Sequence, residues 1–457
     1  LTLSGGNLRF YRTGAIKIPV TQTANMNIEA YTDSGYAKTV GTFAGPITVT
    51  GGKTNVRSSS DKQGQVVFAG GATYSGGELF VQSAAEWIIV SNRVTQPGYC
   101  GLESGGTRIL VKDGGSLEMR GGSGNHLFVG VGTSGILEIG TNGVVNLGAT
   151  QCTIGHNPNG FGYVVLNGGT LITTNTACNV RLGNNSATLG SIVLNSGTMQ
   201  VIKPLILGGT SGAITFNGGT LKMQATTTSG LIPSTVPITV QANGGTLNVE
   251  TNSVKLGSAG INGPGTLNII GGRVEMDAAS PQWTGGVVVV SGEIAFATNT
   301  FYGSSLNVGP GTIRLAGTNA IRAVSGSGGS LIVAGTNTVG SLSGSLIKAG
   351  AGQLNITSAD PSVNLTVQEG TIACVGLSIP QTVSPAVWID ANSTASFVTN
   401  GTAGITRVYD RRTPGDANGF YAEPLYNPPI LTNRALNTHP IIDFGRSTTS
   451  LDRKSVV

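Results

Sequence analysis

The amino-acid sequence predicts an all-β chain: a parallel β-helix with three short strands per coil, followed by part of an antiparallel jelly-roll module. A five-residue phrase, Asn-Gly-Gly-Thr-Leu at 167–171, returns in variant forms at intervals of roughly 18 to 28 residues, a period typical of stacked repeats. Between the glycines, apolar and polar residues alternate with the period of a strand. No stretch holds apolar residues at the 3.6-residue period of a helix.

The phrase is best preserved in the middle of the chain, and looser copies extend to residue 372. Its glycines provide a turn with a positive φ angle or a close approach of two backbones. The predicted turn positions are Gly143, Gly169, Gly197, Gly219, Gly245 and Gly265.

One cycle of the repeat contains three short alternating stretches, as at 170–173, 179–183 and 191–194. A single coil cannot bury its apolar face, so neighbouring coils must stack. Each strand then pairs in parallel with its counterpart about 4.8 Å away. Glycine, at 72 of 457 residues, opposes helix formation, and a hydrophobic content of 39% argues against disorder.

The pattern divides the chain into three segments. Residues 1–110 form less regular β-solenoid coils, residues 111–376 carry the regular repeat, and residues 385–457 form a second module. Two prolines interrupt the pattern between 379 and 385, after which aromatic and charged residues become more frequent.

Charged residues make up only 10% of the chain, against a typical value of about 25%, so Thr, Ser, Asn and Gly must coat the surface. The net charge of +5 comes from scattered residues, which argues against a nucleic-acid partner. No apolar run approaches the 18 residues of a membrane-spanning helix. Because Leu1 begins in mid-pattern without a signal peptide, we interpret the chain as a piece of a longer protein. The low charge and the richness in Thr, Asn and Gly lead us to expect an extracellular or cell-surface location.

The repeat cycle, with Gly following Ile or Leu at 154–155, 182–183 and 207–208, resembles the autotransporter-associated β-strand repeats of large bacterial surface proteins. The resemblance covers about 260 residues. It implies a β-helical surface protein, and its degenerate motif specifies the fold more than any one function.

The tail resembles the opening of a LamG-like, concanavalin-type jelly-roll module in three stretches, 386–391, 408–412 and 435–445. This resemblance implies binding of glycan or protein more often than catalysis. A whole module would need about twice the residues present, so its ligand site cannot be assigned. The motif residues are Trp388, Asp390, Asp410, Pro440, Asp443 and Phe444.

Cys152 and Cys178 each lie nine residues after a turn glycine, which predicts that they face each other on adjacent coils. Two interpretations remain open at this point. The pair is either a ladder of small buried side chains or an inter-coil disulfide, for which the Cα separation must be roughly 4.4 to 6.8 Å.

Catalytic residues are not expected. A polysaccharide lyase or hydrolase needs clustered carboxylates, and none occurs between Glu138 and Glu250. Glu275 and Asp277 share a strand face that we interpret as solvated. The three histidines, His126, His156 and His439, have no metal-ligand spacing, although the first two lie about one coil apart. We therefore expect no cofactor and no metal.

Trp87 and Trp283 are isolated aromatic residues. On an open face they would offer rings for stacking on sugars, whereas the interpretation we favour is packing in the core.

The leading hypothesis is an extracellular structural protein that forms a surface stalk, filament or layer with copies of itself. Solenoid ends carry unpaired strand edges, and weakly charged faces do not repel one another. The alternative is an adhesin whose LamG-like module binds extracellular glycans. A third hypothesis is a β-helix polysaccharide lyase or hydrolase.

Overall fold

The chain divides into two compact units, Leu1–Leu377 and Ser378–Val457. The computed structural model describes residues 1–30, 39–58, 64–74, 78–82, 85–90, 93–96, 100–102, 107–119, 126–148, 151–185, 188–209, 211–224, 231–256, 260–276, 282–297, 305–360, 362–375, 397–399, 405–409, 421–422, 430–436 and 439–443.

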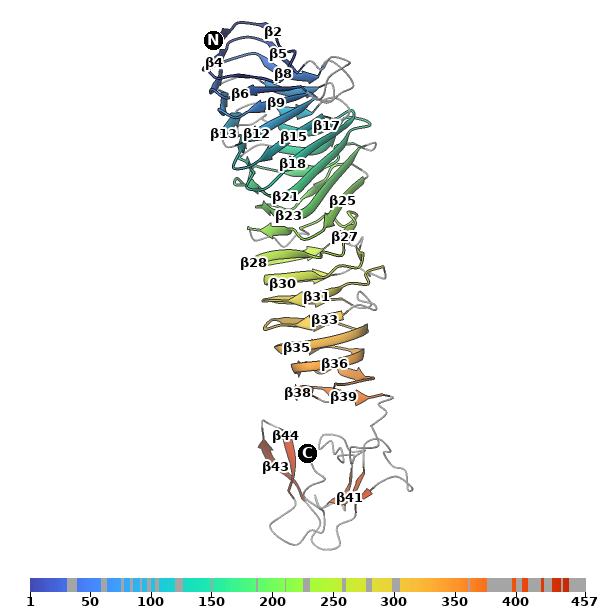
Figure 1. The fold of residues 1–457 in the computed structure, drawn as a ribbon. Helices are drawn as coiled ribbons and strands as arrows, with labels where there is room; N and C mark the ends of the chain where they lie inside the picture. Colours follow the sequence, from blue (N-terminus) through green and yellow to red (C-terminus); the bar gives the residue numbers. More distant parts are fainter. Residues whose placement is uncertain are drawn as a thin grey trace. The chain divides into compact units, whose positions relative to one another are not determined.

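The prediction of an all-β chain with parallel strands is confirmed. The described residues contain strands, turns and bends but no helix. All strand pairings described within the first unit are parallel, as in the pair of β18 (Ser134–Ile139) with β21 (Phe161–Thr173). Figure 1 shows these strands lying one above another from β2 to β39.

The first part of this stack repeats three strands per cycle, which we call a rung. Each strand pairs with the strand three places later, so that β2 pairs with β5 and β5 with β8. One of the three columns is a nine-stranded sheet made of β2 (Gly6–Phe10), β5 (Met26–Ala30), β8 (Lys53–Ser58), β11 (Glu78–Gln82), β14 (Cys100–Leu102), β17 (His126–Val131), β20 (Gln151–His156), β22 (Val180–Leu182) and β24 (Ile206–Leu207).

The other columns join into a sheet of 30 strands. Its remaining members up to β23 are β1 (Thr2–Leu3), β3 (Gly14–Ile16), β4 (Val20–Gln22), β6 (Val40–Phe43), β7 (Ile47–Val49), β9 (Gln65–Phe68), β10 (Ala72–Tyr74), β12 (Glu86–Val90), β13 (Arg93–Gln96), β15 (Thr107–Lys112), β16 (Ser116–Met119), β19 (Val144–Leu147) and β23 (Leu189–Val201). Its later members are β25 (Ser211–Phe216), β26 (Thr220–Met223), β27 (Ile238–Val240), β28 (Gly245–Leu256), β29 (Ile261–Asn262), β30 (Leu267–Met276), β31 (Gly286–Val289), β32 (Glu293–Phe296), β33 (Ser305–Val308), β34 (Thr312–Leu315), β35 (Ala320–Val333), β36 (Thr336–Ala349), β37 (Gln353–Ile356), β38 (Asn364–Val367) and β39 (Thr371–Cys374).

The expectation of three strands per coil as far as residue 376 is wrong beyond β24. There the nine-stranded sheet ends, and the described strands repeat in a cycle of two, with β25 paired to β27 and β26 to β28. The cycle also shortens. The stacked residues Asn167 and Asn195 are 28 residues apart, whereas Asn319 and Asn337 are 18 apart. The change to two described strands per cycle comes before most of this shortening, because Asn217 and Asn243 are still 26 residues apart.

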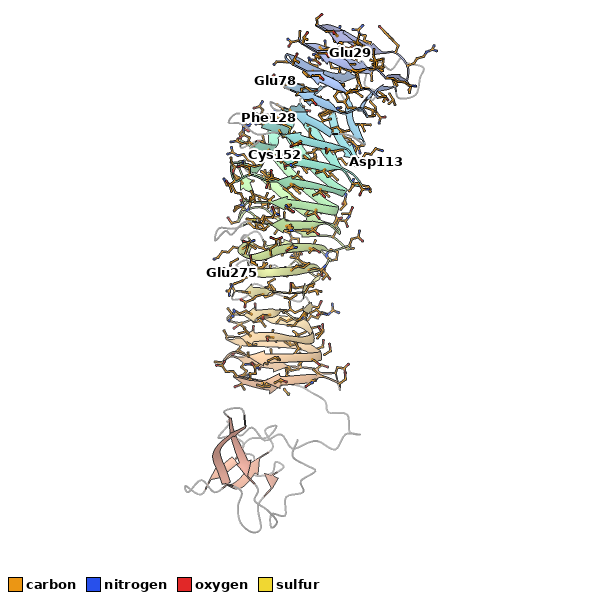
Figure 2. All side chains as sticks on the ribbon, turned by 90° about the vertical axis from the view of Figure 1, so that its left-hand side faces the viewer. Glu29, Glu78, Asp113, Phe128, Cys152 and Glu275 are labelled. Atoms are coloured by element: carbon orange, nitrogen blue, oxygen red, sulfur yellow. The ribbon has the colours of Figure 1, made fainter. Side chains whose placement is uncertain are left out.

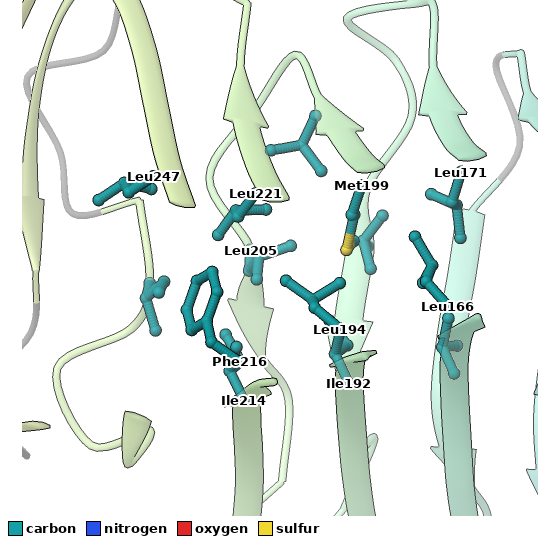
Figure 3. Packing of buried hydrophobic residues seen from close by; sticks show 14 of the residues in the cluster. Leu166, Leu171, Ile192, Leu194, Met199, Leu205, Ile214, Phe216, Leu221 and Leu247 are labelled. Atoms are coloured by element: carbon teal, nitrogen blue, oxygen red, sulfur yellow. The ribbon is translucent and has the colours of Figure 1, made fainter. Parts of the chain in front are cut away.

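A continuous apolar core runs along the stack, because alternate residues of each strand point inward. Leu171, Met199, Leu221 and Leu247 are register partners on four successive rungs, and all four are buried (Figure 3). Burying one such side chain contributes about 1.5–3 kcal/mol. The core therefore grows by the same increment with every rung.

The second unit contains antiparallel pairs, as predicted for the tail. β40 (Phe397–Thr399), β41 (Ile405–Tyr409) and β42 (Tyr421–Ala422) form one sheet, and β43 (Ile430–Leu436) pairs with β44 (His439–Asp443). The division at Leu377 lies beside the predicted boundary at 379–385. The predicted boundary near residue 110 falls inside β15.

Candidate functional site

The two glycines of the repeated phrase have different roles, which the sequence alone did not distinguish. In the first full copy of the phrase, Gly168 has a φ angle of 96°, which favours glycine. A Cβ atom on the next residue, Gly169, would lie 2.4 Å from Cγ2 of Ile139, so that position is closed by the preceding rung. The predicted turn residues Gly143, Gly169, Gly197, Gly219, Gly245 and Gly265 all lie in or just before a strand.

The asparagine of the repeated phrase has a role that the sequence analysis missed. Its side chains form a ladder along the stack, each Nδ2 donating to the Oδ1 of the preceding rung. The distances are 2.8 Å from Asn195 to Asn167, 3.1 Å from Asn217 to Asn195 and 2.9 Å from Asn243 to Asn217. The recurrence of Asn at one place in the phrase was the available signal.

A carboxylate fixes the direction of this ladder. Asn167 donates to Oε1 of Glu138 at 2.9 Å, and Arg108 donates to the other oxygen. An ionised carboxylate only accepts hydrogen bonds, so Asn167 must present its Nδ2 to Glu138 and its Oδ1 to the next rung. The same orientation then passes from amide to amide. A second ladder, from Asn55 through Asn27 to Asn7, runs in the same direction.

Cys152 and Cys178 do not occupy the same position on their rungs. The Cα register partner of Cys152 on the next rung is Val180, because Cys178 precedes the strand β22 by two residues. Both thiols are buried and free, so the disulfide interpretation is not supported. Burial raises the pKa of Cys178 to about 12 and that of Cys152 further still.

Both tryptophans belong to the core, and the sugar-stacking interpretation is wrong for each. Trp87 is 0% exposed and packs edge-on against Phe68, with ring centroids 5.5 Å apart. Trp283 is 1% exposed, and its Nε1 donates to the carbonyl of Gly265 at 2.9 Å. Neither ring is available to a ligand.

His126 and His156 lie in an aromatic stack on the outer side of the nine-stranded sheet, whereas His439 lies in β44. Phe128 is sandwiched between His126, at a centroid distance of 5.1 Å, and His156, at 4.0 Å. Phe128 and Cys152 mark the adjacent strands β17 and β20 in Figure 2. The sequence predicted no role for the two histidines, because the phenylalanine between them could not be placed.

Charged side chains on the outer faces pair from rung to rung. Oε1 of Glu275 lies 2.9 Å from Nε of Arg273, and its Oε2 lies 3.6 Å from Nζ of Lys255. Oε1 of Glu293 pairs with both Arg273 and Arg314. The predicted solvated face at Glu275 is thus part of a partly exposed ion-pair network. Its neighbour Asp277 lies outside the described residues.

A buried lysine lies near the C-terminal end of the first unit, in β36. Lys348 is 0% exposed, and its Nζ donates to the carbonyl oxygens of Gly350, Gly352 and Glu369 at 2.5, 2.7 and 2.6 Å. Three carbonyl dipoles therefore surround a cation that is shielded from water.

The first rung has strand edges without a strand partner in the described part of the chain. There β1 pairs only with β4, β2 only with β5, and β3 only with β6. Exposed apolar side chains gather on the same rung, at Leu1, Tyr11 and Ile18. At the other end of the unit, β38 and β39 likewise have one described partner each.

The tail-module residues are only partly covered. Pro440 and Asp443 lie in β44, opposite Ala435 and Ile430. Outside the described residues lie Trp388, Asp390, Asp410 and Phe444.

Within the described ranges, no group of three or more His, Cys, Asp or Glu side chains is arranged to hold a metal ion. No helix in that part of the chain has the length and hydropathy needed to cross a membrane. No protein-family model matches the chain, and no curated protein matches its sequence.

Proposed function

We propose that this chain is an extracellular structural protein whose first unit is a stalk or wall element that associates with copies of itself into a filament or layer. The observation that carries this proposal concerns residues 1–457 alone: in the described part of the chain, the three strands of the first rung are hydrogen-bonded on one side only. Unpaired strand edges are templates for pairing with another chain.

The finer fold in this proposal is a parallel β-helix that carries the start of a LamG-like jelly roll. The rung-to-rung register of the first unit supports the β-helix, and the antiparallel strands after Ser378 support the jelly roll. A low charge content, at 10% of residues, supports an extracellular location and close packing of neighbouring copies.

The backbone of β1 indicates which groups an incoming strand would meet. The carbonyls of Leu1 and Leu3 accept hydrogen bonds from Thr21 and Thr23 at 2.8 and 3.0 Å. Alternate residues of a strand direct their backbone groups to opposite sides, so Thr2 presents its N–H and C=O to the open edge. Thr2 is also exposed.

The test is the mass of the chain in mild buffer at micromolar concentration, measured by analytical ultracentrifugation. We expect assemblies larger than a monomer. Thr2→Pro removes the donor at the open edge and should reduce assembly, whereas the matched control Thr2→Val keeps the backbone donor and should assemble normally. Equal assembly of both variants would indicate that copies contact each other through the sides of the stack or through the second unit.

A clean monomer at these concentrations would contradict self-association. A native, longer protein that stays monomeric while residues 1–457 assemble would also contradict it, since residues preceding Leu1 would then cover the edge.

The antiparallel strands of the second unit support one alternative function, that of a glycan-binding adhesin. It shares the same fold and differs in its partner. Retention of the full chain on a glycan array, together with a monomeric mass, would favour this alternative.

A further inference from the structure

A chain of polar contacts connects two rungs beside the aromatic stack. Nη1 of Arg181 donates to Oδ1 of Asn184 at 3.2 Å, and Nδ2 of Asn184 lies 3.1 Å from Nδ1 of His156. The backbone N–H of Asn184 donates to Oγ1 of Thr188 at 2.8 Å, which holds the corner that carries the amide.

The chemistry of these groups orients the chain of contacts. A guanidinium only donates hydrogen bonds, so Asn184 must turn its oxygen to Arg181 and its NH2 group to His156. Nδ1 of His156 must then accept, and the ring carries its proton on Nε2. Protonating Nδ1 would set two donors against each other at 3.1 Å.

Within the described residues, the charged groups that act on His156 give its imidazolium no counter-charge. The titratable and charged side chains that face His156 in the described part of the chain are His126 from β17 and Arg181 from β22. No Asp or Glu occurs between Glu138 and Glu250. The remaining face of the imidazole packs on Phe128 at 4.0 Å.

We infer that Arg181 and Asn184 hold His156 as a neutral imidazole with Nδ1 as acceptor, and that this cluster makes the stack sensitive to acid at β20 and β22. This inference is independent of self-association. Burial, His126 and Arg181 each lower the pKa of His156 below its ordinary value of 6.5.

The direction of the pH effect follows from linkage. Because the folded-state pKa of His156 is lowered, the unfolded chain binds the proton first as the pH falls through 6.5. The stability that the neutral histidine contributes is therefore complete above about pH 7 and is lost as the pH falls from there toward the folded-state pKa. Protonation of the folded chain then releases Asn184 and the corner at Thr188.

Nuclear magnetic resonance on the full chain tests the tautomer. We expect His156 to carry its proton on Nε2 at neutral pH and to titrate with a midpoint below 6.5. Asn184→Asp replaces the donor with an acceptor, so it should move the proton to Nδ1 and raise the midpoint by about one pH unit or more. An Nδ1–H tautomer in the wild type, or an unchanged midpoint in Asn184→Asp, would overturn the inference.

A second measurement does not depend on that variant folding. His156→Gln keeps an acceptor for Asn184 but cannot titrate. The wild type should lose more of its thermal stability between pH 7.5 and pH 5.5 than His156→Gln loses. The amides of Ile154 to Gly183 should also be less protected at pH 5.5, once their exchange rates are divided by the intrinsic rates at each pH. Equal losses in the two proteins would show that His156 is not the acid-sensitive group.

Discussion

At the scale of single residues, Lys348 differs most from its expected environment. Lysine is rarely fully buried, and an unpaired buried ammonium costs several kcal/mol. Here all three ammonium protons have carbonyl acceptors, two in the turn after β36 and one in the turn before β39. The side chain therefore joins the turn before β37 to the turn before β39, which belong to successive rungs.

Replacing Lys348 with Met keeps the length of the side chain and removes the ammonium. Three carbonyls would lose a charged donor, and we expect a loss of about 2–4 kcal/mol in unfolding free energy. Urea denaturation of the full chain measures this loss as a lower midpoint. The control Lys112→Met removes a partly exposed lysine that pairs with Asp113 at the surface, and it should change the free energy by less than about 0.5 kcal/mol. Similar losses in both variants would mean that the three hydrogen bonds from Lys348 to carbonyl oxygens contribute nothing to stability.

At the scale of the element, the asparagine ladder connects successive rungs through side-chain amides. Each interior amide donates once and accepts once, whereas Asn243 ends the ladder and only donates. The ladder residues stand beside turn glycines, so they hold the turns of successive rungs in register.

An interior amide should therefore contribute more than a terminal one. Asn195→Ala removes two hydrogen bonds and should lower the unfolding free energy by about 1–2 kcal/mol, while Asn243→Ala removes one at an exposed end and should cost about 0.5–1 kcal/mol. Urea midpoints compared at unchanged m-values give both quantities. The reverse order would refute the ladder as a stabilising unit.

At the scale of the whole molecule, the first unit is a quasi-one-dimensional stack. Each rung contacts its neighbours, so stability is close to a sum over rungs and their interfaces. Rungs with two strands and rungs with three share one core, because the inward columns of the larger sheet continue past β24.

Removing one whole two-strand rung should thus leave a folded chain. Asn319 and Asn337 are stacked equivalents 18 residues apart, so deletion of residues 319–336 places Asn337 where Asn319 stood. Circular dichroism should still show a cooperative β-sheet transition. Deletion of residues 319–327, about half a rung, brings a turn opposite a strand and should abolish or greatly broaden that transition. A cooperative transition in both deletions would contradict rung-by-rung assembly.

Much of the fold was predictable because its information is local and periodic. Alternation at 170–173 indicated a strand, the Gly168–Gly169 pair indicated a turn, and their recurrence indicated parallel stacking. The candidate sites were less predictable. Cys178 was placed opposite Cys152 by counting from a glycine, yet the bend before β22 shifts it by two residues.

The sequence by itself determined that the chain is all-β and that its strands stack in parallel, since both depend on neighbours in the chain. The tertiary structure alone decided that the rung changes from three strands to two, that Glu138 orients four asparagines, that Phe128 lies between two histidines and that Lys348 meets three carbonyls. These features depend on which residues of different rungs become neighbours. That register is set by the number of residues in every intervening turn, and a shift of one or two residues changes each partner.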